Sequence, residues 1–114
     1  MKSGARGFVC TPFLQQYHGY PHHYQNFTLQ GHRYLFESIG FKIISAGHAV
    51  GPVVGLTTLI AAGLRDYVPR PLNRLAWAVW SVIALLVKPL DRLLEDNASA
   101  HALASTTYVV IQKP

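Results

Sequence analysis

The sequence contains few of the residues on which several common protein functions depend. Its 114 residues include one cysteine, Cys10, so it offers neither a disulfide framework nor a cysteine-based zinc site. Only five residues are acidic. We find no carboxylate pair for acid–base catalysis, no Ser-His-Asp order and no phosphate-binding loop. Since no apolar segment follows the polar start MKSGARG, a secretory signal is not expected either.

The composition favours a folded domain with little surface charge. Half of the residues are hydrophobic and 13% are charged, so disorder is excluded over most of the chain. The net charge of +5 is spread along the sequence without a basic run. This pattern does not indicate nucleic-acid binding, and it points only weakly to an anionic lipid or substrate. Cys10 falls in a predicted strand, where we expect a buried small hydrophobic residue rather than a nucleophile.

The first half of the chain predicts a strand, a loop, a helix and a second strand. An apolar run closed by a proline predicts a strand over residues 7–13. The loop YHGYPHHYQNFT follows over residues 17–28, and its last residue, Thr28, is suited to cap a helix. Apolar residues then recur at helical spacing as far as Gly40, a good terminator. FKIISA, residues 41–46, predicts the second strand.

The second half predicts a pair of apolar helices and a last strand. One helix covers Pro52–Leu64 and begins with a proline suited to a first helical turn. The other covers Leu75–Val87, and a charged elbow containing two prolines joins the two. TTYVVIQKP, rich in β-branched residues, predicts a strand near residues 106–112. The chain thus reads as one domain, 1–114, with a helical insertion over about 48–96.

The helical pair is poorly built to span a membrane. The apolar stretch Ile43–Leu64 has 22 residues, but Gly47, Gly51, Pro52 and Gly55 interrupt it. The second run would reach about 20 Å, short of a hydrocarbon core of roughly 30 Å. We therefore expect a hairpin that is buried or lies in the membrane interface. For Trp77 and Trp80, two alternatives remain open: packing in a core or interface, or anchoring at a membrane surface. For the basic residues at the ends of the hairpin, the alternatives are a solvated rim or contact with anionic lipid head groups: Arg65, Arg70, Arg74, Lys88 and Arg92.

The loop at residues 17–28 is the candidate functional segment. A metal site formed by His18, His22 and His23 is not expected, because no acidic or cysteine partner lies near them. Two readings remain open: a wall of a substrate pocket, with His22 or His23 able to exchange protons near neutral pH, or rings that pack the loop onto the sheet. The candidate substrate-binding residues are Tyr20, His22, His23 and Tyr24. Tyr24 and Phe27 are the most suited to a structural role, and we expect structural roles for His32 and His48.

The order of these elements and the wording of the loop resemble the C-terminal third of a class I S-adenosylmethionine-dependent methyltransferase of the type 11 group. In that family, strand five ends in a proline–aromatic pair, as Pro12-Phe13 does here. An H-x-Y-x-F/M-T loop then leads into a helix that ends in GF, as at Gly40-Phe41. A variable helical insertion precedes a final strand that often ends in Lys-Pro. The resemblance covers nearly the whole chain from Gly7 onward.

The resemblance implies a partial Rossmann-like α/β fold with a hydrophobic helical-hairpin insertion before the last, antiparallel strand. It implies methyl transfer from S-adenosylmethionine to a small-molecule, lipid or glycan acceptor, with the loop on the acceptor side. The family holds that cofactor on a Gly-rich turn after strand one, and no G-x-G-x-G turn occurs in this sequence. We therefore expect an inactive fragment that binds no cofactor alone. The catalytic residues are not assigned. The alternative is a small non-enzymatic membrane-associated protein with a hydrophobic hairpin.

Two expectations about assembly follow from the resemblance. The last strand should lie between the other two, and Phe8–Phe13 should present an unpaired edge. This edge would pair with a missing N-terminal half or with a second copy of the chain. We also expect a cytoplasmic location with peripheral membrane contact, and no nucleic-acid partner.

Overall fold

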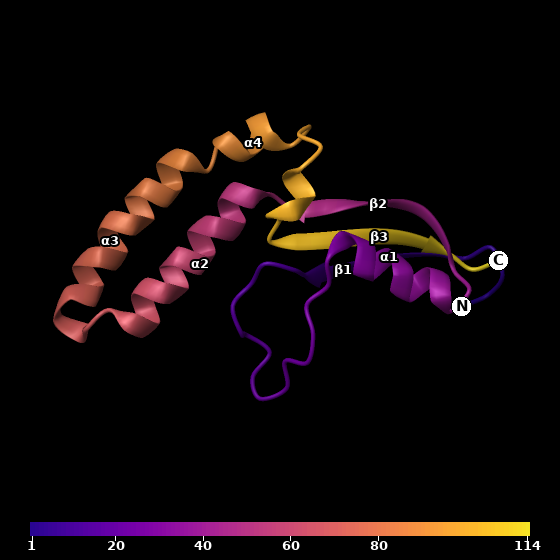
Figure 1. Ribbon diagram of the computed structural model, residues 1–114, viewed down its shortest axis with the longest axis horizontal. Coiled ribbons are helices and arrows are strands. Elements are labelled where there is room, and N and C mark those ends of the chain that lie inside the picture. Colours follow the sequence, from indigo (N-terminus) through magenta and orange to yellow (C-terminus); the bar gives the residue numbers. More distant parts are fainter.

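The protein is a mixed α/β structure with a long helical arm, and the computed structural model describes residues 1–114. The molecule is elongated, with principal extents of 57 × 36 × 19 Å, because the arm projects away from the sheet (Figure 1). The elements, in chain order, are β1 (Arg6–Pro12), α1 (Leu29–Ser38), β2 (Lys42–Val50), α2 (Pro52–Tyr67), α3 (Arg70–Val87), α4 (Leu90–Leu94), the short 3-10 helix η1 (Ala100–Ala102) and β3 (Thr106–Gln112).

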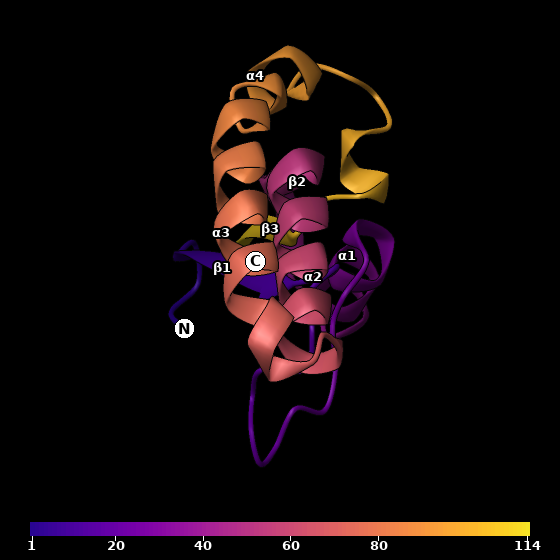
Figure 2. The ribbon, with the colours of Figure 1, turned by 90° about the vertical axis from the view of Figure 1, so that its left-hand side faces the viewer.

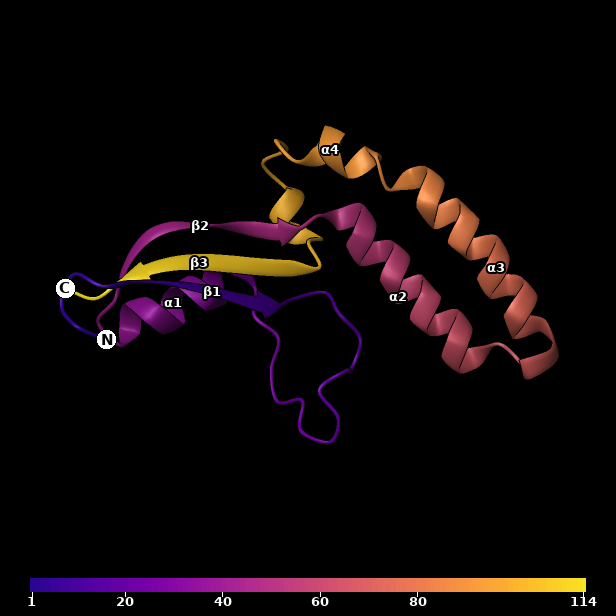
Figure 3. The same ribbon diagram turned by 180° about the vertical axis from the view of Figure 1, so that it is seen from behind.

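The three strands form one sheet in the order β1-β3-β2, with β3 antiparallel to both neighbours. Val109 at the middle of β3 pairs with Val9 on one side and Ala46 on the other. The prediction that the last strand lies between the other two is confirmed. Because β1 and β2 run in the same direction, the loop after β1 and the helix after β2 leave the same end of the sheet (Figures 1 and 3).

Helix α1 covers one face of the sheet. Thr28 caps it as predicted, since the Thr28 hydroxyl accepts a hydrogen bond from the Gly31 amide at 3.0 Å. Gly40 follows the helix with a φ of 87°, a conformation that glycine adopts without strain. Beneath α1 lie the buried alternate side chains of β3, Thr107, Val109 and Ile111.

The opposite face of the sheet is uncovered. Phe8 is 65% exposed and stacks on Tyr108, with ring centroids 5.5 Å apart. Cys10 lies on this face and is exposed, so the expectation of a buried cysteine is wrong. Strand β3, although it is the central strand, is fully buried only on its α1 side. Alternation along a strand sends every second side chain to the uncovered face, whatever its hydrophobicity.

The arm is formed by α2 and α3, and the bounds of both helices differ from the predicted ones. Strand β2 continues to Val50, beyond its predicted end at residue 46, and α2 ends at Tyr67 instead of Leu64. Helix α3 begins at Arg70 instead of Leu75, since Pro69 and Pro71 are compatible with a helix start. None of its residues is buried, which contradicts a buried hairpin. Neither α2 nor α3 combines the length and the hydrophobicity required to cross a bilayer.

The arm is held together and anchored by a few specific contacts. The Trp80 indole donates a hydrogen bond to the Thr57 carbonyl at 3.0 Å, and the Asn73 amide donates to the Leu64 carbonyl at 3.2 Å. These bonds join α3 to α2, which lie side by side in Figure 2. At the base of the arm, the Asp91 carboxylate caps α2 by accepting from the Val53 and Val54 amides at 2.8 and 3.0 Å.

Candidate functional site: the loop between the first strand and the first helix

The loop that leaves the end of β1 is held in shape by its own side chains. His23 is half-buried at its centre. Its Nδ1 atom accepts hydrogen bonds from the His18 amide at 3.1 Å and from the Gly19 amide at 3.4 Å. An Nδ1 that accepts leaves the proton on Nε2, and Nε2 lies 2.6 Å from the Asn26 side-chain oxygen. Both ring nitrogens of His23 are therefore used within the loop.

Asn26 connects this arrangement to the end of β1. Its side-chain amide donates to the Phe13 carbonyl at 2.9 Å and to the Gln15 carbonyl at 3.3 Å. The Phe27 amide adds a bond to the Pro12 carbonyl at 2.9 Å. A chain of hydrogen bonds thus runs from the loop tip through His23 and Asn26 to the strand. His23 holds the loop in position through its hydrogen bonds.

The other candidate residues surround His23 and are open to solvent. Tyr20 is 85% exposed and Tyr24 is 87% exposed. The His22 ring stacks on Tyr24 with the ring planes 4° apart and the centroids at 5.8 Å. Tyr17 stacks on His23 at 5.3 Å and donates its hydroxyl to the Pro21 carbonyl at 2.8 Å. The structural role expected for Tyr24 is wrong, because almost all of its side chain is exposed.

The predicted residues belong to a largely exposed cluster of aromatic and imidazole rings rather than to the wall of a cavity. Five cavities lie along the arm and at its base, and none is lined by Tyr20, His22, His23 or Tyr24. The chain also brings no three His, Cys, Asp or Glu side chains together in an arrangement suited to a metal ion. The loop can therefore offer stacking surfaces and the imidazole of His22 to a flat or cyclic ligand, and a second wall is needed to enclose that ligand.

The predicted structural residues lie behind this surface. Phe27 stacks on His32 with ring centroids 5.7 Å apart. His32 is completely buried, with Nδ1 at 3.4 Å from the Thr11 hydroxyl and 3.5 Å from that of Thr107. Its Nε2 atom has no hydrogen-bond partner. Burial lowers the pKa of His32 from its ordinary value of 6.5, which keeps the ring neutral at neutral pH.

Sequence reasoning did not find two of the residues that shape this region. Asn26 organises the loop, but a single asparagine three positions after a histidine carries no recognisable signal. Asp91 caps α2 from 37 and 38 residues away in the sequence, and only the folded arm reveals it. His48 lies on β2 opposite Thr107 and is half-buried, and its structural role stays a prediction.

Comparisons with protein-family profiles, with curated proteins and with solved structures find no match to this chain.

Proposed function

We propose that this chain is the C-terminal part of a class I S-adenosylmethionine-dependent methyltransferase domain of the type 11 group, and that it supplies the acceptor-side loop. The observation that carries the proposal is the strand order β1-β3-β2 with an antiparallel central strand. It corresponds to the order that the resemblance implies, in which the family's last strand lies between strands five and six. The crossover helix and the insertion before the last strand also fall in the expected places.

The position of the loop supports an acceptor-side role. In open α/β sheets, ligands bind beyond the carboxyl ends of the parallel strands. The loop follows β1 at that end, and α2 follows β2 at the same end. Tyr20, His22 and Tyr24 are free to contact an acceptor, while His23 holds the loop in place. Strands on the far side of β1 would provide the second wall and the cofactor site.

A fusion protein tests this proposal. The strand-one-to-strand-four half of a type 11 methyltransferase is joined to residues 6–114, and calorimetric titration with S-adenosylmethionine is performed on the fusion and on this chain alone. We expect micromolar, saturable binding by the fusion and no binding by the chain alone. Binding by the chain alone contradicts the proposal. So does a fusion that fails to bind although the parent methyltransferase binds.

A second candidate function is a non-enzymatic membrane-associated protein, and the exposed apolar surface of the arm favours it. In that case the chain is complete in function without strands on the far side of β1. The two candidates differ in one result: only the methyltransferase proposal predicts that the fusion gains a site for S-adenosylmethionine.

A further inference from the structure

The arm carries a continuous apolar surface that no part of the chain covers. Ten large hydrophobic side chains of α2 and α3 are each at least 43% exposed, and eight of them lie on one side of the arm. The members on α3 recur every three or four positions and those on α2 at spacings of four and seven, so each set forms a stripe along its helix. We call these eight residues the apolar face: Leu56, Ile60, Tyr67, Leu72, Leu75, Val79, Val82 and Leu86.

Both stripes lie on the same side of the arm. The contact line between the helices passes through Thr57 on α2 and Trp80 on α3. At about 100° per residue, Leu56 lies about a quarter turn from the line on α2. Val79 lies about a quarter turn from it on α3. Since the two helices run antiparallel, equal rotations in the same sense bring both stripes to one side.

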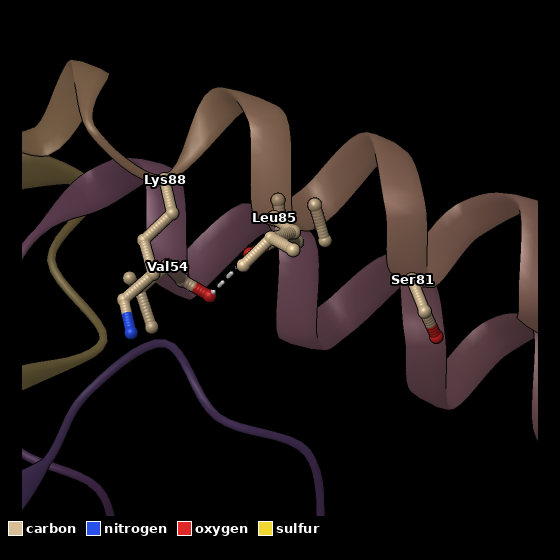
Figure 4. Close-up of a pocket in the computed structure, with 6 residues that line it drawn as sticks. Val54, Ser81, Leu85 and Lys88 are labelled. Carbon is tan, nitrogen blue, oxygen red and sulfur yellow. Dashed lines mark hydrogen bonds between the residues drawn. The ribbon is translucent and has the colours of Figure 1, made fainter.

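The opposite side of the arm carries the basic residues of the arm, together with two exposed apolar side chains, Trp77 and Leu85. Figure 4 shows Ser81 and Lys88 pointing to the same side of the groove between α2 and α3. Helical spacing places Arg65, Arg70 and Arg74 on this side as well. Helix α3 contains no acidic residue. Among these basic residues only Arg65 forms an ion pair, with Asp66 at 2.7 Å.

We propose that the arm lies flat in the interface of an anionic lipid bilayer, with the apolar face towards the acyl chains. A helix with aliphatic residues on one side and Lys and Arg on the other is the arrangement that binds this interface. A protein interface carries about one hydrogen bond per 100–200 Å² to fix its register. The Tyr67 hydroxyl is the one side-chain hydrogen-bonding group of the apolar face. A lipid bilayer does not need such hydrogen bonds, because its molecules are not held in one fixed position against the protein.

This inference does not depend on methyl transfer. The basic side sets a preference for anionic lipid, because each Lys or Arg near a negatively charged surface strengthens binding by about fivefold. The apolar face inserts at the boundary between head groups and acyl chains, whichever head group the lipid carries. Binding should therefore have a salt-dependent part from Arg70, Arg74 and Lys88, and a salt-independent part from the apolar face.

The first test is flotation of the full chain with vesicles of phosphatidylcholine, alone or mixed with phosphatidylglycerol. The matched variants are Val79→Asp on the apolar face and Ser81→Asp on the basic side, which add the same charge to the same helix. We expect Val79→Asp to abolish binding to both kinds of vesicle. We expect Ser81→Asp to weaken only the anionic binding, by about fivefold. Circular dichroism verifies that both variants fold.

The second test locates the face in contact with lipid. An environment-sensitive fluorophore is attached at Val79→Cys or at Ser81→Cys, in a chain whose exposed Cys10 is replaced by serine. When anionic vesicles are added, we expect the fluorescence of the label at position 79 to report an apolar environment. We expect the label at position 81 to keep reporting water.

Three results overturn the proposal. The first is that the unaltered chain does not float with anionic vesicles. The second is that Val79→Asp and Ser81→Asp have equal effects on binding. The third is that the label at position 79 is shielded before vesicles are added, which assigns the apolar face to a second copy of the chain.

Discussion

His32 is the residue whose chemistry matters most to the small core. It lies fully buried between Phe27 and Phe36, and the groups facing its Nδ1 atom are the hydroxyls of Thr11 and Thr107. No anionic side chain is within reach to compensate a proton, and Nε2 has no partner. The charged form of His32 therefore pays a desolvation cost that the neutral form avoids.

This burial predicts a decline in stability at mildly acidic pH. Because the pKa of His32 is lowered in the folded protein, the unfolded chain binds the proton more readily. The contribution of His32 to stability is therefore complete above the ordinary value of 6.5 and is lost as the pH falls below it. Urea unfolding between about pH 7.5 and pH 5 measures the slope. His32→Leu should flatten it, and an unchanged slope in that variant would assign the effect to other groups.

The loop provides a second prediction at this scale. Asn26→Ala removes the acceptor of the His23 Nε2–H group and both bonds to the end of β1. At about 1 kcal/mol per hydrogen bond, we expect proteolytic cleavage of the loop to become at least about fivefold faster. Tyr24→Ala, at an 87% exposed position of the same loop, is the control and should leave the rate unchanged. Equal rates in the two variants contradict the positioning role of Asn26.

At the scale of elements, the arm is fixed to the sheet by a close approach at Gly55. A Cβ atom at this position would lie 3.0 Å from the Leu103 carbonyl oxygen and 3.1 Å from the Ser105 amide nitrogen. Both neighbours belong to the backbone, so neither moves without shifting the segment that leads into β3. The absence of a side chain at Gly55 is what allows α2 to pack here.

Two glycine substitutions in α2 test this packing. Gly55→Ala forces α2 away from residues 103–105, and we expect it to lower the free energy of unfolding by about 1–3 kcal/mol. Gly63→Ala places its Cβ where no atom lies within 4 Å, and helix propensity predicts stabilisation by up to about 1 kcal/mol. Thermal unfolding of both variants measures the difference. Equal effects would show that α2 does not contact this segment closely.

The kind and order of the elements could be predicted because local signals specify them. The Thr28 cap, the Pro52 helix start and the β-branched run near Val109 each act within one element. The bounds of α3 were less accessible, because Pro69 and Pro71 are read as breakers until a helix is seen to begin between them. The projection of the arm was not predictable, since it depends on the distant contacts of Gly55 and Asp91.

The candidate site was predictable in part. The aromatic and histidine composition of residues 17–28 made this loop the candidate, and the structure places it at the end of β1. The different roles of neighbouring residues were not visible, because the Nδ1 bonds that make His23 structural come from backbone amides. The exposure of Cys10 depends in the same way on which face α1 covers.

At the scale of the whole molecule, the sheet has open edges and one open face. Strand β1 pairs only with β3, and Phe8 lies exposed on the uncovered face. Unpaired edges with exposed apolar side chains promote association. We expect the isolated chain to form oligomers. Cys10→Lys places a charge on this strand and should lower the average mass measured by light scattering. Tyr34→Lys, on the exposed side of α1, should not. A monodisperse unaltered monomer contradicts this prediction.

The central claim is that β1 is an interior strand of a larger sheet, and amide hydrogen exchange of β1 tests it most directly. In the chain alone, diluted until light scattering shows a monomer, the alternate amides of Arg6–Pro12 that do not bond to β3 should exchange rapidly, whereas those of β3 are protected. In the fusion with the strand-one-to-strand-four half, the account predicts strong protection of these same β1 amides. Rapid exchange in both proteins would contradict it.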